Sequence, residues 1–332
     1  MSGGSDVAQS APAGTPVSAP SAPVAAARGP HASRSTSLVD LGAVSHGSTP
    51  RQPARPGGAW QTILSCLVPC AAILGGCATP SNAFVHSPLS RCEEVSGQTG
   101  RVRVATFNIR AGLSSDLETI AETLAALDAD VIALQEVDVG VARTGRVDQA
   151  RTLAERLGYD FVFAGAMKRE GGDYGVALLS RLPIEAARRI PLVAGGAFEP
   201  RVAIDATVCA GSERLRVVAV HVDFLPWAAA ANARTLAEAL DSEPGEPTVV
   251  AGDLNMGPGE EAPSIFTRRG FVDVVGRFDE GPTFEGGQRL DYVLVDPSLA
   301  SDAGPAMREE STASDHFPVI ADLSLPGTNA SR

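Results

Sequence analysis

The residues VVAGDLNMGP, at positions 249–258, place two polar side chains where an apolar run ends. A short apolar run closed by glycine and proline is typical of a buried strand that leads into a turn. Asp253 and Asn255 face the same side of such a strand because they are two positions apart. A carboxylate can accept a proton or a hydrogen bond. An amide side chain both accepts and donates hydrogen bonds. An Asx-turn, in which the side chain bonds its own backbone, is the structural alternative.

Polar residues recur at this kind of position along the chain. Each follows or interrupts an apolar strand, where a core would prefer valine or leucine. The eight are Asn108, Glu136, His221, Asp253, Asn255, Asp291, Asp315 and His316. Burying each without a partner would cost about 1–3 kcal/mol, so we expect them to gather around one another. Such groups transfer protons and hold divalent cations.

The elements that position these residues follow from apolar periodicity. RVRVATFNIRAG (101–112) alternates as a strand, Ser115 to Glu118 fit a capping box, and 117–127 keep helical spacing. DVIALQEVD (130–138) is a second strand, so a crossover should place both strands in one sheet.

The rest of the chain mixes strands with three more helices. The helices are expected over 148–157, 226–240 and 262–269, and Gly211-Ser212 marks a hairpin turn. We therefore predict an α/β fold of two packed mixed sheets with helices outside.

The N-terminal 100 residues differ from the remainder. Residues 1–58 are rich in Ala, Pro, Ser and Gly and contain no aromatic residue, which predicts a disordered tail. A coding start placed upstream of the true N-terminus would account for the tail equally well. Residues 78–100 are interpreted as a linker to a catalytic domain at 101–326.

Residues 59–77 have the length of a signal peptide and follow Arg51 and Arg55. Their ending, Leu74-Gly75-Gly76-Cys77, resembles a bacterial lipobox, in which Cys77 would be acylated and become the first mature residue. Ala78 would then direct the protein to the outer membrane or cell surface. The alternatives are an ordinary cleaved signal peptide, with a secreted or periplasmic product, or a short anchor.

The cysteines bear on the redox compartment of the protein, and its charge bears on whether it binds nucleic acid. Cys92 and Cys209 remain outside the targeting segment and could pair in an oxidising compartment or stay as two buried thiols. Of the 27 basic and 39 acidic residues, only five and four lie in 1–96, so the acidic excess falls in the remainder. Non-specific nucleic-acid binding is therefore not favoured.

Six motifs in order carry a family resemblance over about residues 101–324. FNIR, LQEVD, the histidine of VVAVHVDF, AGDLN, LDYVLV and SDHFPVIADL resemble the endonuclease/exonuclease/phosphatase superfamily, including pancreatic-type deoxyribonuclease. The resemblance implies a four-layered α/β sandwich and metal-dependent phosphoester hydrolysis. It implies that Glu136 is the main Mg²⁺ ligand, that Asn108 orients it, and that Asp315 is a further ligand. Mn²⁺ or Ca²⁺ could replace Mg²⁺.

The same resemblance assigns the catalytic groups. Asp253 would hold and deprotonate the attacking water, and Asn255 would donate its amide to a phosphate oxygen. His316, paired with Asp291, and His221 would supply positive charge to the transition state.

Two features depart from the family or belong to a subgroup. Position 110 is arginine where abasic-site enzymes carry an acidic metal ligand, so Arg110 would contact phosphate or pair with a carboxylate. ARTGRVDQARTLAERLG (142–158) and Glu199-Pro200-Arg201 resemble bacterial hydrolases related to glycosylphosphatidylinositol remodelling proteins. Arg143, Arg146 and Arg201 would bind phosphate oxygens, or form surface ion pairs.

Together these observations predict an exported, lipid-anchored, monomeric enzyme acting on a phosphoester. A diester is preferred over a monoester because no dense Lys/Arg cluster exists to neutralise a dianion. The expected substrate is a lipid headgroup or small phosphodiester, and the runner-up is an extracellular nuclease. A surface binding module without activity is a third interpretation, which the presence of Glu136, Asp253 and His316 disfavours.

Overall fold

The computed structural model describes residues 78–94, 100–192, 199–243, 245–300 and 303–325. The predicted tail 1–58 and the predicted targeting segment 59–77, including Cys77, lie outside the described residues. No helix among the described residues is both long enough and apolar enough to cross a bilayer.

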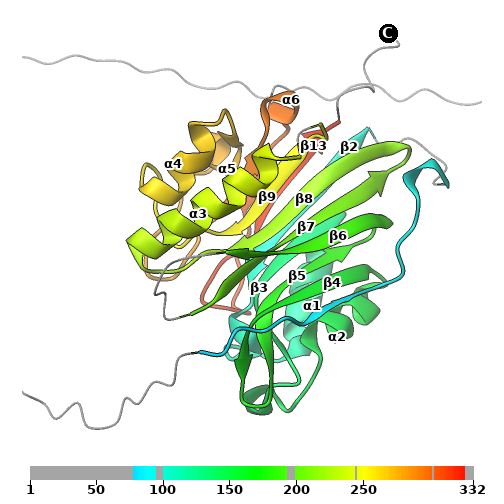
Figure 1. Cartoon of the computed structure of the whole chain (residues 1–332), viewed down its shortest axis with the longest axis vertical. Helices are drawn as coiled ribbons and strands as arrows, with labels where there is room; N and C mark the ends of the chain where they lie inside the picture. Colours follow the sequence, from blue (N-terminus) through cyan, green and yellow to red (C-terminus); the bar gives the residue numbers. More distant parts are fainter. Residues whose placement is uncertain (1–77, 95–99, 193–198, 244, 301–302, 326–332) are drawn as a thin grey trace, which may run out of the picture. The chain divides into compact units, whose positions relative to one another are not determined.

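Two β-sheets form the centre of the fold (Figure 1). In spatial order, the seven-stranded sheet contains β1 (Phe84–His86), β4 (Asp160–Arg169), β5 (Gly172–Ser180), β3 (Val131–Val139), β2 (Arg101–Asn108), β13 (Val319–Ser324) and β12 (Ala306–Arg308). The six-stranded sheet contains β10 (Val272–Asp273), β11 (Asp291–Val295), β9 (Thr248–Asp253), β8 (Glu213–His221), β7 (Arg201–Ala210) and β6 (Ile184–Leu192). Both sheets are mixed, as predicted.

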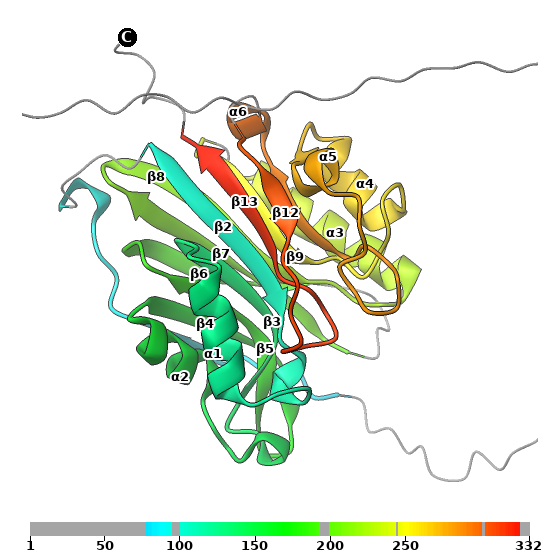
Figure 2. The same cartoon turned by 180° about the vertical axis from the view of Figure 1, so that it is seen from behind.

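Helices cover the outer faces of the two sheets, which Figures 1 and 2 show from opposite sides. The α-helices are α1 (Leu117–Ala126), α2 (Gln149–Leu157), α3 (Pro226–Asp241), α4 (Glu261–Thr267), α5 (Val275–Phe278) and α6 (Pro297–Ala300). Short 3-10 helices are η1 (Cys92–Glu94), η2 (Arg110–Gly112) and η3 (Ala142–Thr144). Apolar residues of α1 and α2 pack on the seven-stranded sheet, and those of α3 and α4 pack on the six-stranded sheet.

Strand alternation explains why three apolar cores separate four layers. On β7, Val202, Ile204, Ala206 and Val208 belong to the core between the sheets. The intervening Ala203 belongs to the core under α3. Because successive strand side chains point to opposite faces, one apolar strand supplies both cores. The predicted α/β sandwich is confirmed.

Two crossover connections bring strand ends to the same edge of the molecule. β2 and β3 pair in parallel and are joined through α1, as the sequence predicts. β8 and β9 also pair in parallel and are joined through α3. The predicted turn at Gly211-Ser212 joins the antiparallel pair β7 and β8. The carboxyl ends of β8 and β9 therefore lie together, and so do those of β2 and β3.

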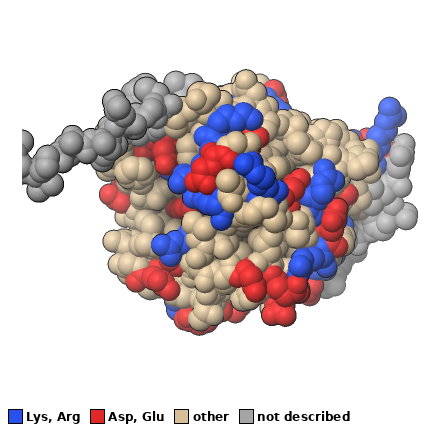
Figure 3. Space-filling model, turned by 90° about the horizontal axis from the view of Figure 1, so that it is seen from below, with Lys and Arg blue, Asp and Glu red and all other residues tan. Residues whose placement is uncertain are grey.

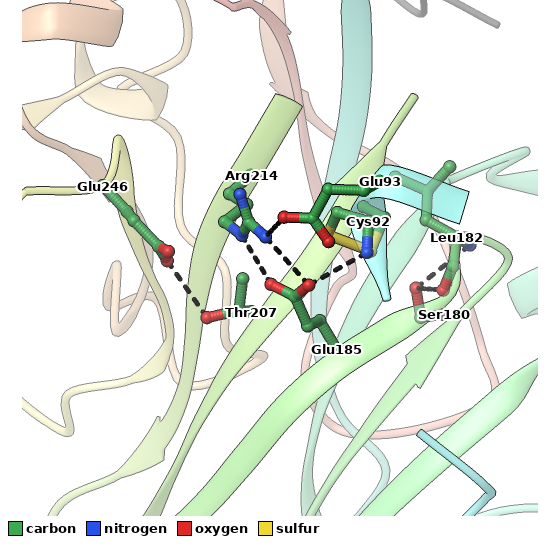
Figure 4. The surroundings of a disulfide bond; sticks show 9 residues. Cys92, Glu93, Ser180, Leu182, Glu185, Thr207, Arg214 and Glu246 are labelled. Atoms are coloured by element: carbon green, nitrogen blue, oxygen red, sulfur yellow. Dashed lines mark hydrogen bonds and ion pairs between the residues drawn. A yellow bond between two sulfur atoms is a disulfide. The ribbon is translucent and has the colours of Figure 1, made fainter. Parts of the chain in front are cut away.

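The segment expected as a linker contributes structure of its own. β1 pairs antiparallel with β4 at the edge of the seven-stranded sheet. Cys92 forms a disulfide with Cys209 on β7, and Arg214 pairs with Glu93 and Glu185 beside it (Figure 4). The described part of 78–94 is thus held against both sheets rather than spanning between separate units.

Candidate active site

Strand register aligns three of the predicted residues in one row. Asp253 ends β9, where it lies opposite His221 of β8 and Asp291 of β11. Side chains directly opposite one another on neighbouring strands share a face of the sheet. Regular pairing of three strands is therefore enough to bring these residues together.

The Asp253 carboxylate lies at the centre of the site. Its Oδ1 accepts a hydrogen bond from the Asn255 backbone N–H (2.8 Å), which is the Asx-turn considered from sequence. Its Oδ2 accepts from Asn108 Nδ2 (3.1 Å). The same oxygen lies 3.7 Å from His221 Nε2 and 3.8 Å from His316 Nε2. The turn and the functional cluster therefore coexist at one residue.

The pKa values of Asp253 and His316 are both raised, for different physical reasons. Burial, reinforced by the negative charge of Asp291, raises the pKa of the Asp253 carboxyl to about 7. Burial alone would lower the pKa of His316, but the charge of Asp291 and its hydrogen bond outweigh it and raise the pKa to about 9. His316 Nδ1 lies 2.9 Å from Asp291 Oδ2. Near neutral pH, His316 is thus an imidazolium beside a carboxylate able to accept a proton.

His221 has the opposite protonation behaviour. Burial, together with the charges of Arg201 and His316, holds its pKa well below the usual range. Arg201 Nη1 lies 3.2 Å from His221 Nδ1, and Asn255 Nδ2 lies 3.0 Å from His221 Nε2. The lowered pKa does not favour the positive charge expected on His221, and the Arg201 guanidinium can only donate to its ring.

Asn108 joins the two sheets within the site. It ends β2 of the seven-stranded sheet, and its Nδ2 donates to Asp253 of the other sheet and to Glu136 Oε1 at 3.2 Å. Glu136 lies at a register shift between Leu134 and Val137 of β3. Such a bulge turns a strand side chain toward a new direction.

Four predicted site residues have left-handed backbone conformations. Their φ angles are 49° for Arg110, 57° for Glu136, 60° for Arg146 and 50° for Asn255. Such conformations cost non-glycine residues about 1–3 kcal/mol and tend to occur at functional sites.

The predicted metal ligands are only partly grouped. One cluster of three described His, Cys, Asp or Glu residues has its ligand atoms within 4.8 Å of one another: Asp253, Asp291 and His316. Glu136 and Asp315 are not in that group, and Asp315 Oδ2 pairs with Arg110 Nε at 3.2 Å. The Glu136 carboxylate lines an open pocket beside the Asn108 amide. These oxygen donors fit a hard cation that keeps several waters.

A pocket of about 290 Å³ opens beside this cluster, and His221 and Asn255 line it. It is lined by Glu136, Arg143, Arg169, Tyr174, Glu199, Arg201, His221, Phe224 and Asn255. The sequence patterns do not indicate Arg169, Tyr174 and Phe224, because the β4–β5 hairpin and the loop after β8 bring them in from separate places.

The predicted arginines have different surroundings. Arg143 forms a bidentate pair with Asp138 (2.8 and 3.0 Å), and Arg201 pairs with Glu199 at 3.0 Å. Arg146 is exposed, bonds to a backbone carbonyl and does not line the pocket. Seen from below Figure 1, toward the carboxyl ends of β2 and β3, basic side chains surround a group of acidic ones (Figure 3).

A layered α/β sandwich of two sheets that gathers carboxylates, amides and imidazoles at its strand ends fits a hydrolytic enzyme. The chain belongs to the Endonuclease/Exonuclease/phosphatase family, whose model matches residues 105–316. The predicted superfamily is thereby confirmed. The site fits the phosphoester hydrolysis for which the family is named, and its cluster of Asp253, Asp291 and His316 could hold a metal ion.

Known proteins of similar sequence and structure cover most of the chain. The chain is 26% identical to the uncharacterized protein YbhP of Escherichia coli (strain K12) over 243 aligned residues. The alignment covers 67% of this chain and 96% of YbhP. The structure of an endonuclease/exonuclease/phosphatase from Beutenbergia cavernae superposes with a TM-score of 0.57 and 22% sequence identity. The match covers 68% of this chain and 72% of that chain. The mannosyl-6-phosphatase Bt3783 of Bacteroides thetaiotaomicron superposes with a TM-score of 0.56 and 19% sequence identity. That match covers 68% of this chain and 100% of the other. These structural likenesses support the fold.

Proposed function

We propose that this protein is a Mg²⁺-dependent phosphodiesterase that acts on a lipid headgroup or another small phosphodiester. The observation that carries the proposal is the buried Asp253 carboxylate, which lies between two imidazoles and the Asn108 amide. A group with a pKa of about 7 is suited to accept a proton from water at neutral pH.

The surrounding residues divide the remaining tasks. Water, held by Asp253, attacks phosphorus opposite the leaving oxygen and gives up its proton to the carboxylate. The His316 imidazolium and the Asn255 amide donate hydrogen bonds to phosphoryl oxygens as negative charge develops there. Neutral His221 donates a hydrogen bond near the leaving oxygen. The P–O bond to the alcohol breaks, the leaving oxygen takes up a proton from solvent water, and Asp253 releases the proton it accepted to solvent.

Glu136 and Asn108 would hold the metal ion at the pocket wall, with Asp315 as a further ligand through water. When bound, Mg²⁺ would neutralise negative charge on a phosphoryl oxygen. Mn²⁺ or Ca²⁺ could serve in its place, since both accept carboxylate and amide oxygens.

The charge of the pocket supports a diester over a monoester. Carboxylates already neutralise two of its three guanidiniums, since Asp138 binds Arg143 and Glu199 binds Arg201. Among the described residues, only the Arg169 guanidinium lines the pocket without a hydrogen bond or ion pair. One uncompensated cation suits the single charge of a phosphodiester better than a dianion.

A substrate panel tests the function directly. Bis(4-nitrophenyl) phosphate, phospholipid vesicles, plasmid DNA and 4-nitrophenyl phosphate are compared with Mg²⁺ and with chelator, using Asp253→Asn as the inactive control. We expect metal-dependent turnover of the soluble diester and of phospholipid. Faster cleavage of plasmid DNA would favour the extracellular nuclease, and turnover that survives chelation would contradict metal dependence.

We also propose that acylated Cys77 attaches a monomeric enzyme to the outer membrane or cell surface. The support is the lipobox-like sequence alone. Membrane fractionation of the full chain and of Cys77→Ser tests it, since the variant should be released. Retention of the variant in the membrane fraction would contradict this attachment.

A further inference from the structure

Two large aromatic side chains are exposed on the turn that follows His221. Phe224 and Trp227 are 53% and 51% exposed. Phe224 also lines the pocket of the candidate active site. Exposed aromatic groups next to a binding pocket mark a contact surface more often than isolated apolar residues do.

The turn is fixed by buried polar contacts. The buried Asp223 accepts a hydrogen bond from the Leu225 backbone N–H (2.8 Å), and its own N–H donates to Asn232 Oδ1 (3.0 Å). The Leu225 carbonyl accepts hydrogen bonds from the N–H groups of Ala228 and Ala229. These hydrogen bonds order the backbone that carries the two exposed rings.

The turn lies at the mouth of the site because of the chain's topology. α3 joins the parallel strands β8 and β9, so its first turn is at the carboxyl end of β8, beside His221. Inside the pocket are polar groups, including Arg201 and the unpaired Arg169. Polar groups inside the pocket, the exposed Phe224 ring on its wall and the exposed Trp227 ring three residues further on match an amphiphile with a charged head and an apolar body.

We propose that the Phe224–Trp227 turn docks on the surface of a phospholipid bilayer and thereby presents lipid headgroups to the pocket. The proposal rests on the proposed function, which it deepens. Aromatic side chains favour the interface between headgroups and acyl chains. The guanidinium of Arg169 complements the phosphate of a headgroup. Stacking of the rings on nucleobases is less favoured, because the acidic excess of the chain repels a polyanion.

Tryptophan fluorescence tests the docking without any chemistry. The chain has two tryptophans, Trp60 and Trp227, so the full chain with Trp60→Phe reports on the turn alone. With chelator present, phosphatidylcholine vesicles that contain brominated acyl chains should quench Trp227 and shift its emission to shorter wavelength.

The matched control carries its single tryptophan on another surface. It combines Trp60→Phe and Trp227→Phe with Phe278→Trp, because Phe278 is 56% exposed and does not line the pocket. Phe278 lies on α5, which follows β10. β10 pairs with Val295, and Val295 is at the other end of β11 from the site residue Asp291. Any anchor near the N-terminus is the same in both proteins. We expect no quenching of the control reporter, and equal quenching of both would overturn the proposal.

Kinetics link the docking to turnover. Trp227→Ser should lower turnover of vesicle phospholipid relative to soluble bis(4-nitrophenyl) phosphate by about tenfold, since apolar aromatic contact area with the bilayer is lost. An unchanged ratio would overturn the proposal, and so would a spectral shift of Trp227 with a single-stranded oligonucleotide but not with vesicles. If neither substrate is turned over, the proposed function fails while the quenching result still decides the docking.

Discussion

Two buried carboxylates in the six-stranded sheet have contrasting surroundings. Asp205, on β7, accepts bidentate hydrogen bonds from Arg216 (2.8 and 2.6 Å) and another from Arg188 (2.8 Å). Arg188 continues to Glu243 at 2.6 Å, beside a cavity of about 300 Å³ on the outer face of the sheet. Asp253, on β9, forms no ion pair with an arginine among the described residues. It lies instead between two imidazoles and an amide.

The difference shows that partners, more than burial, separate a structural carboxylate from a reactive one. Burial would raise the pKa of Asp205, yet hydrogen bonds from Arg216 and Arg188 lower it below its usual range. Burial and Asp291 raise that of Asp253 to about 7. Buried atoms without a hydrogen-bond partner among the described residues, Asp291 Oδ1 and Arg201 Nε, occur in the site around Asp253.

The largest expected effect is on turnover after Asp253→Asn. Asparagine keeps the shape but cannot accept the proton of water, so kcat should fall by about 10³- to 10⁴-fold. The folded-state pKa of Asp253 lies above its unfolded value, so at about pH 8 the buried charge opposes folding. In chelator the variant should therefore unfold at a higher temperature than the wild type. Steady-state kinetics and calorimetry check both statements, and retained turnover would remove Asp253 from its role.

Asp205→Asn should have the opposite profile. It leaves two guanidiniums facing a neutral group, and breaking a buried ion pair costs about 3–5 kcal/mol. The free energy of unfolding, measured by urea titration, should fall by about that amount. The kcat of the folded fraction should not change. If both Asp→Asn variants shift stability in the same direction, the contrast between the two carboxylates is wrong.

The pair of His316 and Asp291 should make stability depend on pH. The folded pKa of His316, about 9, lies above the ordinary value near 6.5, so its stabilising effect is full below about pH 6.5 and is lost as pH rises through 9. The difference in unfolding free energy between wild type and His316→Gln, measured in chelator, should shrink by about 3 kcal/mol from about pH 6 to pH 10. Asp291→Asn should flatten this dependence, and a difference that grows with pH would contradict the pairing.

The central residues can be predicted from the amino-acid sequence because their positions depend on regular strand pairing. His221, Asp253 and Asp291 each end or begin an apolar run, and parallel or antiparallel register places them side by side. Their residue types and their places in the runs therefore indicate one shared site. The bulge that redirects Glu136 and the raised pKa of Asp253 depend on packing between the two sheets, which no single strand encodes.

Contacts between distant segments account for the features that local sequence patterns do not predict. The capping-box pattern assigns Ser115 to the start of α1, but its hydroxyl donates to the carbonyl of Ala313, and Asp116 caps the helix instead. β1 has three residues, too few for any periodicity, and forms because β4 offers an open edge. Arg169 follows the same rule, since the β4–β5 hairpin alone brings it to the pocket.

The smallest expected effect separates two arginines that the sequence alone does not rank. Arg169 lines the pocket, places its guanidinium 5.8 Å from the centre of the Tyr174 ring and has no carboxylate partner among the described residues. Arg146 is exposed and bonds to the Gly140 carbonyl. Removing a charge-assisted hydrogen bond to phosphate costs about 1.5 kcal/mol, so Arg169→Gln should raise KM for a soluble diester about tenfold.

Arg146→Gln is the matched control, because it removes the same charge from the same face of the molecule without touching the pocket. Its KM should stay within about twofold of the wild type, because Arg146 does not line the pocket. Equal increases for both variants would mean that the general charge of the face attracts substrate. A change confined to Arg169→Gln would instead assign binding to an unpaired guanidinium, which is the feature that distinguishes this site from the fully paired cluster around Asp205.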